Sequence, residues 1–121
     1  MEYFSIPSIR NQQKQELIRK NYRKIYEHEM AHKNAAGSLA GAIVIEKNSE
    51  GIPIGGHVSI KMPKLDKLHP EKTIKQAETV FKAAMAPSDP SSQDYKVAAE
   101  AKNIKGQAEN IQKKQRLDYY A

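Results

Sequence analysis

Apolar residues recur at a helical period in the first third of the chain. Ile18, Tyr22 and Ile25 follow one another at spacings of four and three residues, which places them on one face of a helix. Ser8 is a suitable N-cap after Pro7, and Gly37 is a natural stop signal. The pattern therefore predicts one long helix over residues 8–36.

The next segment has the pattern of two short strands. Residues 42–47 are rich in β-branched side chains, and residues 54–61 form the second predicted strand, with apolar side chains at Ile54, Val58 and Ile60. A polar turn that ends in Gly51 separates them, which predicts a β-hairpin. The pair Gly55-Gly56 inside the second strand indicates a bulge or a close backbone approach.

Two further helical patterns follow a loop rich in proline and lysine. The first opens at Pro70 and stops at Pro87, and the second runs from the polar segment 89–94 to about residue 111. The sequence therefore predicts an α+β fold with a long first helix, a β-hairpin and two helices that pack back on the first. A length of 121 residues fits a single domain spanning 1–121, with flexible termini at 1–7 and 112–121.

Composition excludes several classes of protein. The chain has no cysteine, which rules out disulfides, thiolate metal sites and a cysteine nucleophile. No apolar stretch approaches the roughly 20 residues that a membrane span requires, and no signal peptide is visible, so we expect a cytoplasmic protein without a membrane partner. The net charge of +6 is spread along the helical segments. Its densest run, Arg10 to Lys24, is interrupted by Glu16, which favours a solvated helix face over a nucleic-acid surface.

The segment His28-Glu29-Met30-Ala31-His32 carries the clearest chemical signal. Histidines at i and i+4 lie one above the other on a helix, so both rings can reach one zinc ion. The glutamate between them is placed to accept a proton from metal-bound water, whose pKa zinc lowers to near 7. Because these residues continue the apolar stripe, we expect them on the buried face of the helix.

A catalytic zinc site usually has three protein ligands, and the spacing leaves the third one open. His57 is the first candidate, because it follows Gly55-Gly56 in a strand that should pack beside the first helix. Asp94 is the second, since it opens the last helix and could turn inward, although it could also be a plain helix N-terminal carboxylate. Glu27 could orient a histidine from outside the ligand set. Weaker ligand candidates are His69, Glu71, Glu78, Asp89 and Glu100.

Three segments together resemble the SprA-related family of bacterial metalloprotease domains, over about residues 26–109. They are Tyr26–Gly41 around the HExxH motif, Ile54-Gly55-Gly56-His57-Val58-Ser59-Ile60, and Ala84–Asp94 followed by Val97-Ala98-Ala99. The resemblance implies a zinc-dependent peptidase with His28 and His32 as ligands and Glu29 as the catalytic residue. An acidic residue often follows the Gly-Gly pair in this family, and both glutamate and histidine can ligate zinc, so His57 fits a ligand position there.

The sequence thus predicts a compact zincin-like metallopeptidase that cleaves peptide bonds in a peptide or protein substrate. Its zinc ligands would be His28, His32 and His57, and Glu29 would be the general base. Zincin peptidases usually place their sheet before the HExxH helix; here too few residues precede it, so the sheet must follow. Two other classes stay open: a helical interaction module with a structural metal site or none, and a basic protein that associates with nucleic acid.

Overall fold

The computed structural model describes residues 9–120, and it has three helices and one two-stranded sheet. The predicted cap at Ser8 and the predicted flexible segment 1–7 lie outside the described residues. In chain order the elements are α1 (Ile9–Ala36), the 3₁₀ turn η1 (Gly37–Leu39), β1 (Ala40–Lys47), β2 (Pro53–Ile60), α2 (Pro70–Ala84) and α3 (Ser92–Tyr120). The predicted α+β class is confirmed.

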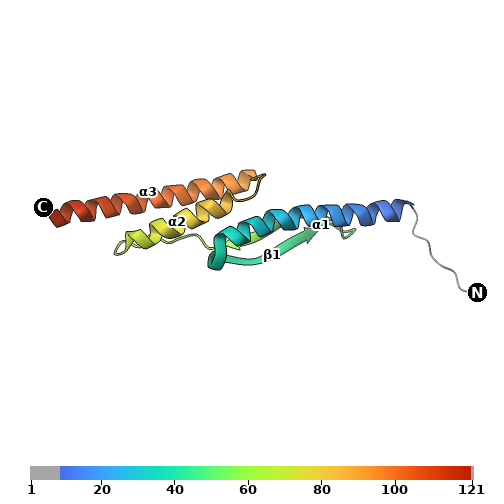
Figure 1. Ribbon diagram of the computed structural model, residues 1–121, viewed down its shortest axis with the longest axis horizontal. Coiled ribbons are helices and arrows are strands. Elements are labelled where there is room, and N and C mark those ends of the chain that lie inside the picture. Colours follow the sequence, from blue (N-terminus) through green and yellow to red (C-terminus); the bar gives the residue numbers. More distant parts are fainter. Residues whose placement is uncertain (1–8, 121) are drawn as a thin grey trace, which may run out of the picture.

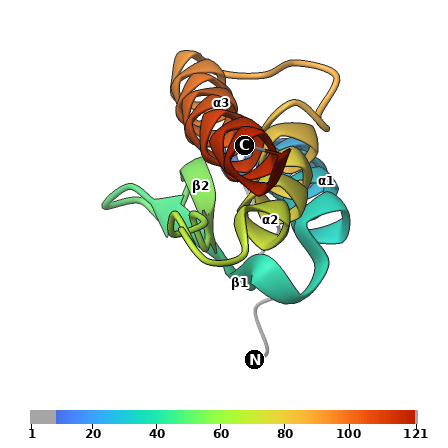
Figure 2. The same cartoon turned by 90° about the vertical axis from the view of Figure 1, so that its left-hand side faces the viewer.

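The molecule is elongated, with α1 and the α2–α3 pair running past each other (Figure 1). The first half of α1 and the last part of α3 point to opposite ends. Both strands pack on α1, and α2 lies against both α3 and α1 (Figure 2). We expected α3 to pack on α1 as well, but it packs mainly on α2. No helix within residues 9–120 is both long and apolar enough to cross a membrane.

The face that α1 buries differs from the predicted stripe at one position. Glu29 and His32 are buried, as the pattern predicted. Tyr22, however, is 44% exposed and stacks on Tyr26 at a ring-centroid distance of 5.8 Å. In its place Asn21 faces β2 and donates a hydrogen bond of 3.0 Å to the main-chain carbonyl of Pro53. The first half of α1 is thus tied to the hairpin by a polar contact.

The hairpin follows the helix through a tight reversal. Gly37 has a φ of +57°, a left-handed conformation that glycine adopts without a steric cost, and it ends α1 where the sequence predicted. The strands are antiparallel, and the register pairs Val44 with His57 and Ile45 with Gly56. Because side chains alternate across a strand, Gly56 faces α1 and His57 faces the opposite side.

The core between α2 and α3 is built from small side chains. Within residues 9–120, seven of the eight buried apolar residues other than proline are alanines, and the eighth is Val80. Small side chains allow the two helix axes to approach closely. The helix α2 begins at Pro70, as predicted, and α3 continues to Tyr120, beyond the predicted limit near residue 111. The Gln115 side chain, which donates to the main-chain carbonyl of Lys67 at 2.8 Å, ties this extension to the loop before α2.

Candidate metal centre

The two histidines of the HExxH motif turn toward one another on the buried face of α1. Their Nε2 atoms are 3.2 Å apart. The side chain of His32 is 6% exposed and that of His28 is 18% exposed, so little water reaches either ring. Together with Glu29, they form a cluster that could hold a metal ion, because one donor atom from each residue lies within 4.8 Å of the others.

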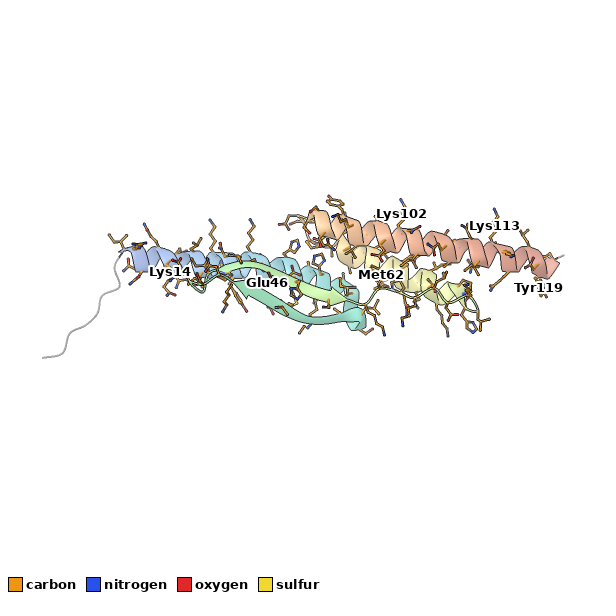
Figure 3. All side chains as sticks on the ribbon, turned by 180° about the vertical axis from the view of Figure 1, so that it is seen from behind. Lys14, Glu46, Met62, Lys102, Lys113 and Tyr119 are labelled. Carbon is orange, nitrogen blue, oxygen red and sulfur yellow. The ribbon has the colours of Figure 1, made fainter. Side chains whose placement is uncertain are left out.

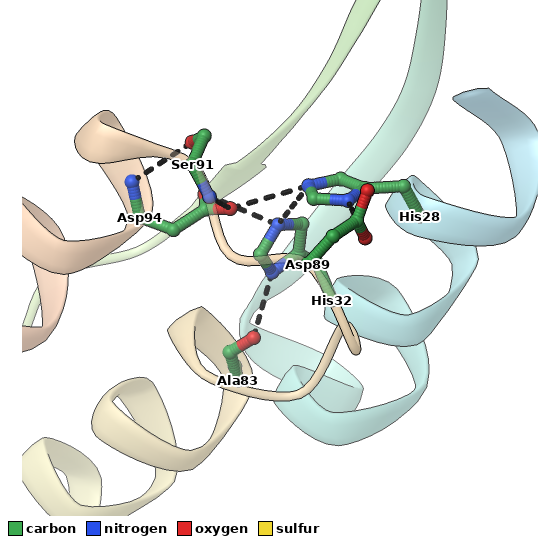
Figure 4. A network of polar contacts seen from close by, with 6 residues as sticks. All are labelled: His28, His32, Ala83, Asp89, Ser91 and Asp94. Atoms are coloured by element: carbon green, nitrogen blue, oxygen red, sulfur yellow. Dashed lines mark hydrogen bonds and ion pairs between the residues drawn. The ribbon is translucent and has the colours of Figure 1, made fainter. Parts of the chain in front are cut away.

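Asp94 completes this arrangement from the first turn of α3. Its Oδ2 lies 3.2 Å from His28 Nε2, and its Oδ1 lies 3.2 Å from His32 Nε2 (Figure 4). A capping box holds the carboxylate in place: Ser91 N–H donates to Asp94 Oδ2 at 2.8 Å, and Asp94 N–H donates to Ser91 Oγ at 3.1 Å. Asp94 is therefore both the carboxylate at the start of α3 and a neighbour of the two histidines.

The outer nitrogen of each ring is also bonded, which determines where the protons lie. His32 Nδ1 is 2.7 Å from the main-chain carbonyl of Ala83, in the last turn of α2. His28 Nδ1 is 3.0 Å from Asp89 Oδ1, in the loop between α2 and α3. A carbonyl and a carboxylate only accept hydrogen bonds, so both Nδ1 atoms carry a proton. In the neutral rings both Nε2 lone pairs then point at each other and at Asp94.

The two Nε2 atoms and the Asp94 carboxylate are acceptors that face one another without a proton between them, so they repel each other. A cation at their centre removes this repulsion. In a tetrahedral zinc site with bonds of about 2.0–2.1 Å, neighbouring donor atoms lie about 3.3 Å apart. The separation of the two Nε2 atoms is 3.2 Å, and so are the distances from His28 Nε2 to Asp94 Oδ2 and from His32 Nε2 to Asp94 Oδ1. The donor set therefore fits a zinc ion in size and in protonation state.

The negatively charged groups around His28 also favour a positive charge at this site. Burial by itself lowers the pKa of His28, but the hydrogen bond and charge of Asp89, with the charges of Asp94 and Glu29, outweigh it. The net result is a raised pKa. In turn, the hydrogen bond from His28 lowers the pKa of Asp89. The site thus favours positive charge, whether a proton or a metal ion supplies it.

Glu29 is buried at the same site, but it lies outside the group formed by His28, His32 and Asp94. It is 7% exposed, and no group within residues 9–120 donates a hydrogen bond to its carboxylate. Gly56 of β2 covers it: a Cβ atom added at Gly56 would lie 2.6 Å from Ile25 Cγ2 and 3.3 Å from Glu29 Cγ. The predicted close approach at the glycine pair is therefore confirmed at Gly56.

The structure does not bring His57 to the histidine pair, although it was the first candidate for third ligand. Its Nδ1 pairs with Glu46 Oε1 at 3.1 Å, and its side chain is 55% exposed. The reason is the two-residue period of the strand: Gly56 points toward α1, so the next residue points away. Asp94, the second candidate, occupies the position expected of His57.

The other candidate residues are distributed over the surface. His69 pairs with Glu71 at 3.5 Å at the start of α2, and Glu78 pairs with Lys105 at 3.2 Å. Glu27 and Glu100 are exposed. Asp89 reaches the site through His28, and the carbonyl of Ala83 reaches it through His32. Sequence reasoning did not identify the Ala83 carbonyl, because a backbone group carries no residue signal.

The site opens into a cleft of about 860 Å³ between α1, β2 and the start of α3. His28, Glu29, His32 and Asp94 line one part of it, and β2 contributes nearly its whole length. Structural zinc sites are normally closed by four protein ligands, whereas catalytic sites keep an open position. Here three converging side chains face an open cleft.

Comparison with known proteins gives one family match. The model of the SprA-related family matches residues 7–118. No curated protein and no solved structure matches the chain. The match includes the HExxH helix, the hairpin, α2 and nearly all of α3, which are the elements that build the site. The chain belongs to the SprA-related family.

Proposed function

We propose that this protein is a zinc-dependent peptidase in which His28, His32 and Asp94 hold the ion and Glu29 is the general base. The observation that carries the proposal is the convergence of the three side chains: the two Nε2 atoms are 3.2 Å apart, each lies 3.2 Å from one oxygen of the Asp94 carboxylate, and both Nδ1 protons are directed outward. Hydrogen bonds from ligand histidines to carbonyl and carboxylate oxygens are typical of metal sites, because they fix the ring and the tautomer.

The donor set favours zinc over other common ions. Calcium and magnesium prefer six or more oxygen donors, whereas two imidazoles and one carboxylate suit zinc. The chain has no cysteine, so thiolate ligation is excluded by composition. Bound zinc would supply Lewis acidity, which lowers the pKa of a water and polarises a carbonyl.

Glu29 would move the proton in this reaction. Its carboxylate has no hydrogen-bond donor within residues 9–120, so it is available to accept a proton from the attacking water. The same group can return that proton to the leaving amine. Its burial under Gly56 holds the carboxylate beside the cleft and restricts its motion.

The free edge of β2 would position the substrate. Within residues 9–120 the sheet has only two strands, so β2 pairs with β1 on one edge, and its other edge borders the cleft. An extended peptide could add to this edge as a third strand and present a carbonyl to the site. Gly55 and Gly56 have no side chains to obstruct it.

Zinc content and peptide cleavage test the proposal together. The purified protein should bind one zinc ion, and His32→Ala should abolish this binding. The zinc-loaded protein should cleave members of a peptide library, and Glu29→Gln should stop cleavage while zinc stays bound. Zinc binding without cleavage by the wild type would indicate a structural metal site. Absence of zinc binding would overturn the metal site itself.

A further inference from the structure

A second hollow lies at the other end of α2, away from the metal centre. It measures about 540 Å³ and is lined by Lys61, Lys64, Lys67 and Lys72, together with the apolar residues Leu65 and Leu68. All four lysines are exposed. No salt bridge joins any of their ammonium groups to a carboxylate within residues 9–120. Asp66 also lines the hollow, and its charge interacts with that of Lys72, so four lysines surround a single carboxylate there and the surface is positive on balance.

The loop that carries these lysines is held in a defined shape. Thr73, 1% exposed, accepts a hydrogen bond from Asp66 N–H at 2.8 Å and donates one to the carbonyl of Lys64 at 3.0 Å. The carboxylate of Asp66 accepts from the backbone N–H groups of Leu68 and His69. These hydrogen bonds lower the pKa of Asp66, and the bond from the His69 N–H contributes most. The acid is thus engaged mainly by the backbone, the charge of Lys72 contributes less, and the lysines remain exposed to solvent.

Leu68 stands out of this basic loop. It is 82% exposed, between Lys67 and His69, although a leucine gains most from burial. The loop therefore combines a rim of positive charge with one protruding apolar side chain. A partner that satisfies both must offer negative charge at its surface and an apolar layer just beneath it.

The end of α3 extends this surface. Gln115 bonds to the carbonyl of Lys67, so the last turns of α3 lie beside the loop. Beyond Gln115, Leu117 is 62% exposed and Tyr119 is 84% exposed. Figure 3 shows Lys113 and Tyr119 on the part of α3 that runs past α2, at the opposite end of the molecule from Lys14. Tyrosines and lysines at one end are typical of membrane–water interfaces.

We propose that residues 61–72, with the end of α3, dock on an anionic lipid bilayer. The lysines around the hollow contact headgroup phosphates, and Leu68 enters the boundary of the acyl chains. A nucleic acid would satisfy the lysines, but its phosphate backbone offers no layer in which to bury Leu68. Such docking needs no membrane-spanning helix. It replaces the expectation, drawn from the absence of a span in the sequence, that a membrane is not a partner.

Vesicle sedimentation at physiological salt tests this proposal with matched variants. The wild type should bind vesicles of phosphatidylcholine and phosphatidylserine and should not bind phosphatidylcholine alone. Each lysine near an anionic surface is worth about fivefold in affinity, so the triple change of Lys64, Lys67 and Lys72 to alanine should weaken binding by more than about tenfold. Removing the same charge at the other end, from Arg10, Lys14 and Lys20, should change binding by less than about twofold.

The apolar contribution has its own pair of variants. Leu68→Ser should weaken vesicle binding severalfold without a change of charge, whereas Ile9→Ser, at a similarly exposed position on α1, should not. Equal binding to both vesicle types, equal loss from the two triple variants, or unchanged binding by Leu68→Ser would overturn the proposal. Displacement by inorganic phosphate at constant ionic strength would also overturn it, in favour of a free-phosphate site.

Binding of duplex DNA that is lost in the lysine variant but not in Leu68→Ser, together with no vesicle binding, would assign the surface to nucleic acid and overturn the proposal. Thermal unfolding of each variant controls for the fold. If the triple lysine variant is unfolded, Leu68→Ser and the salt dependence of wild-type binding still decide the outcome. The metal centre is not involved, so zinc binding should be unchanged in all these variants.

Discussion

Replacing Asp94 by asparagine separates its role at the metal centre from its role at the helix end. The asparagine keeps an oxygen that can accept the hydrogen bond from Ser91 N–H, so the start of α3 should be preserved. It removes the charge that faces both Nε2 atoms at 3.2 Å. The free energy of unfolding of the zinc-free protein should therefore change by less than about 1 kcal/mol.

Zinc affinity should respond much more strongly. Changes outside the ligand set typically cost about 10–100-fold in metal affinity, so loss of a ligand charge should cost at least about 100-fold. The Asp94 side chain is only 15% exposed, and water can replace its charge poorly. At saturating zinc for the wild type, a 100-fold loss removes about 2.7 kcal/mol of zinc-dependent stabilisation. Thermal unfolding with and without zinc measures this difference, and a chelator competition assay measures the affinity itself.

The matched control is His57→Ala. Because the His57 ring pairs with Glu46 on the far face of the hairpin, its removal should leave zinc affinity unchanged. The opposite result would refute the reasoning: wild-type affinity in Asp94→Asn together with a large loss in His57→Ala. That outcome would mean that the hairpin turns its other face to α1 when the metal binds.

Three further expectations follow from the same site. Asp89→Asn should reduce zinc affinity by about 10–100-fold, measured by the same chelator competition, because it weakens the bond that orients His28; wild-type affinity would show that this bond is dispensable. In the zinc-free protein, NMR titration should place the pKa of His28 above its usual value. Protonation of His28 should therefore stabilise the fold below about pH 6.5, and this stabilisation should be lost as the pH rises through the raised pKa. A pKa at or below the usual value would contradict this expectation. Gly56→Ala should destabilise the protein by about 1–3 kcal/mol in chemical unfolding, because the added Cβ would lie 2.6 Å from Ile25 Cγ2. Gly55→Ala should have little effect, because the atom nearest to its added Cβ is 3.8 Å away. Equal losses of stability in the two variants would exclude the close contact as the cause.

Local patterns predicted the elements of the fold well. A helical period, two glycine-bounded strands and a proline at the first turn of a helix each depend on nearby residues, and the structure has α1, the hairpin and α2 where these signals lie. The proximity of the two histidines in the HExxH motif could also be predicted from nearby residues alone, since residues four apart on a helix share a face. The buried position of His32 and Glu29 followed from the stripe that precedes them.

The third member of the site could not be predicted in the same way. Asp94 is separated from His28 by 66 residues, and only the packing of α3 on α2 and of α2 on α1 brings the first turn of α3 to His28. His57 was the better candidate by residue type, but a strand reverses the direction of its side chains at every residue. Once Gly56 is known to face α1, His57 must face away. The choice between His57 and Asp94 therefore depended on which face of β2 packs on α1, and the sequence does not reveal this without the strand register.

The position of the site also connects its chemistry to the stability of the fold. The molecule has two parts, α1 with its hairpin and α2 paired with α3, and they meet mainly where α1 packs on α2. The buried apolar residues of the described chain are mostly alanines, which bury little surface, so this packing contributes little hydrophobic stabilisation. An ion held by His28 and His32 on one side and Asp94 on the other would join the two parts directly. The same two parts form the walls of the cleft, so metal binding and the shape of the cleft should depend on each other.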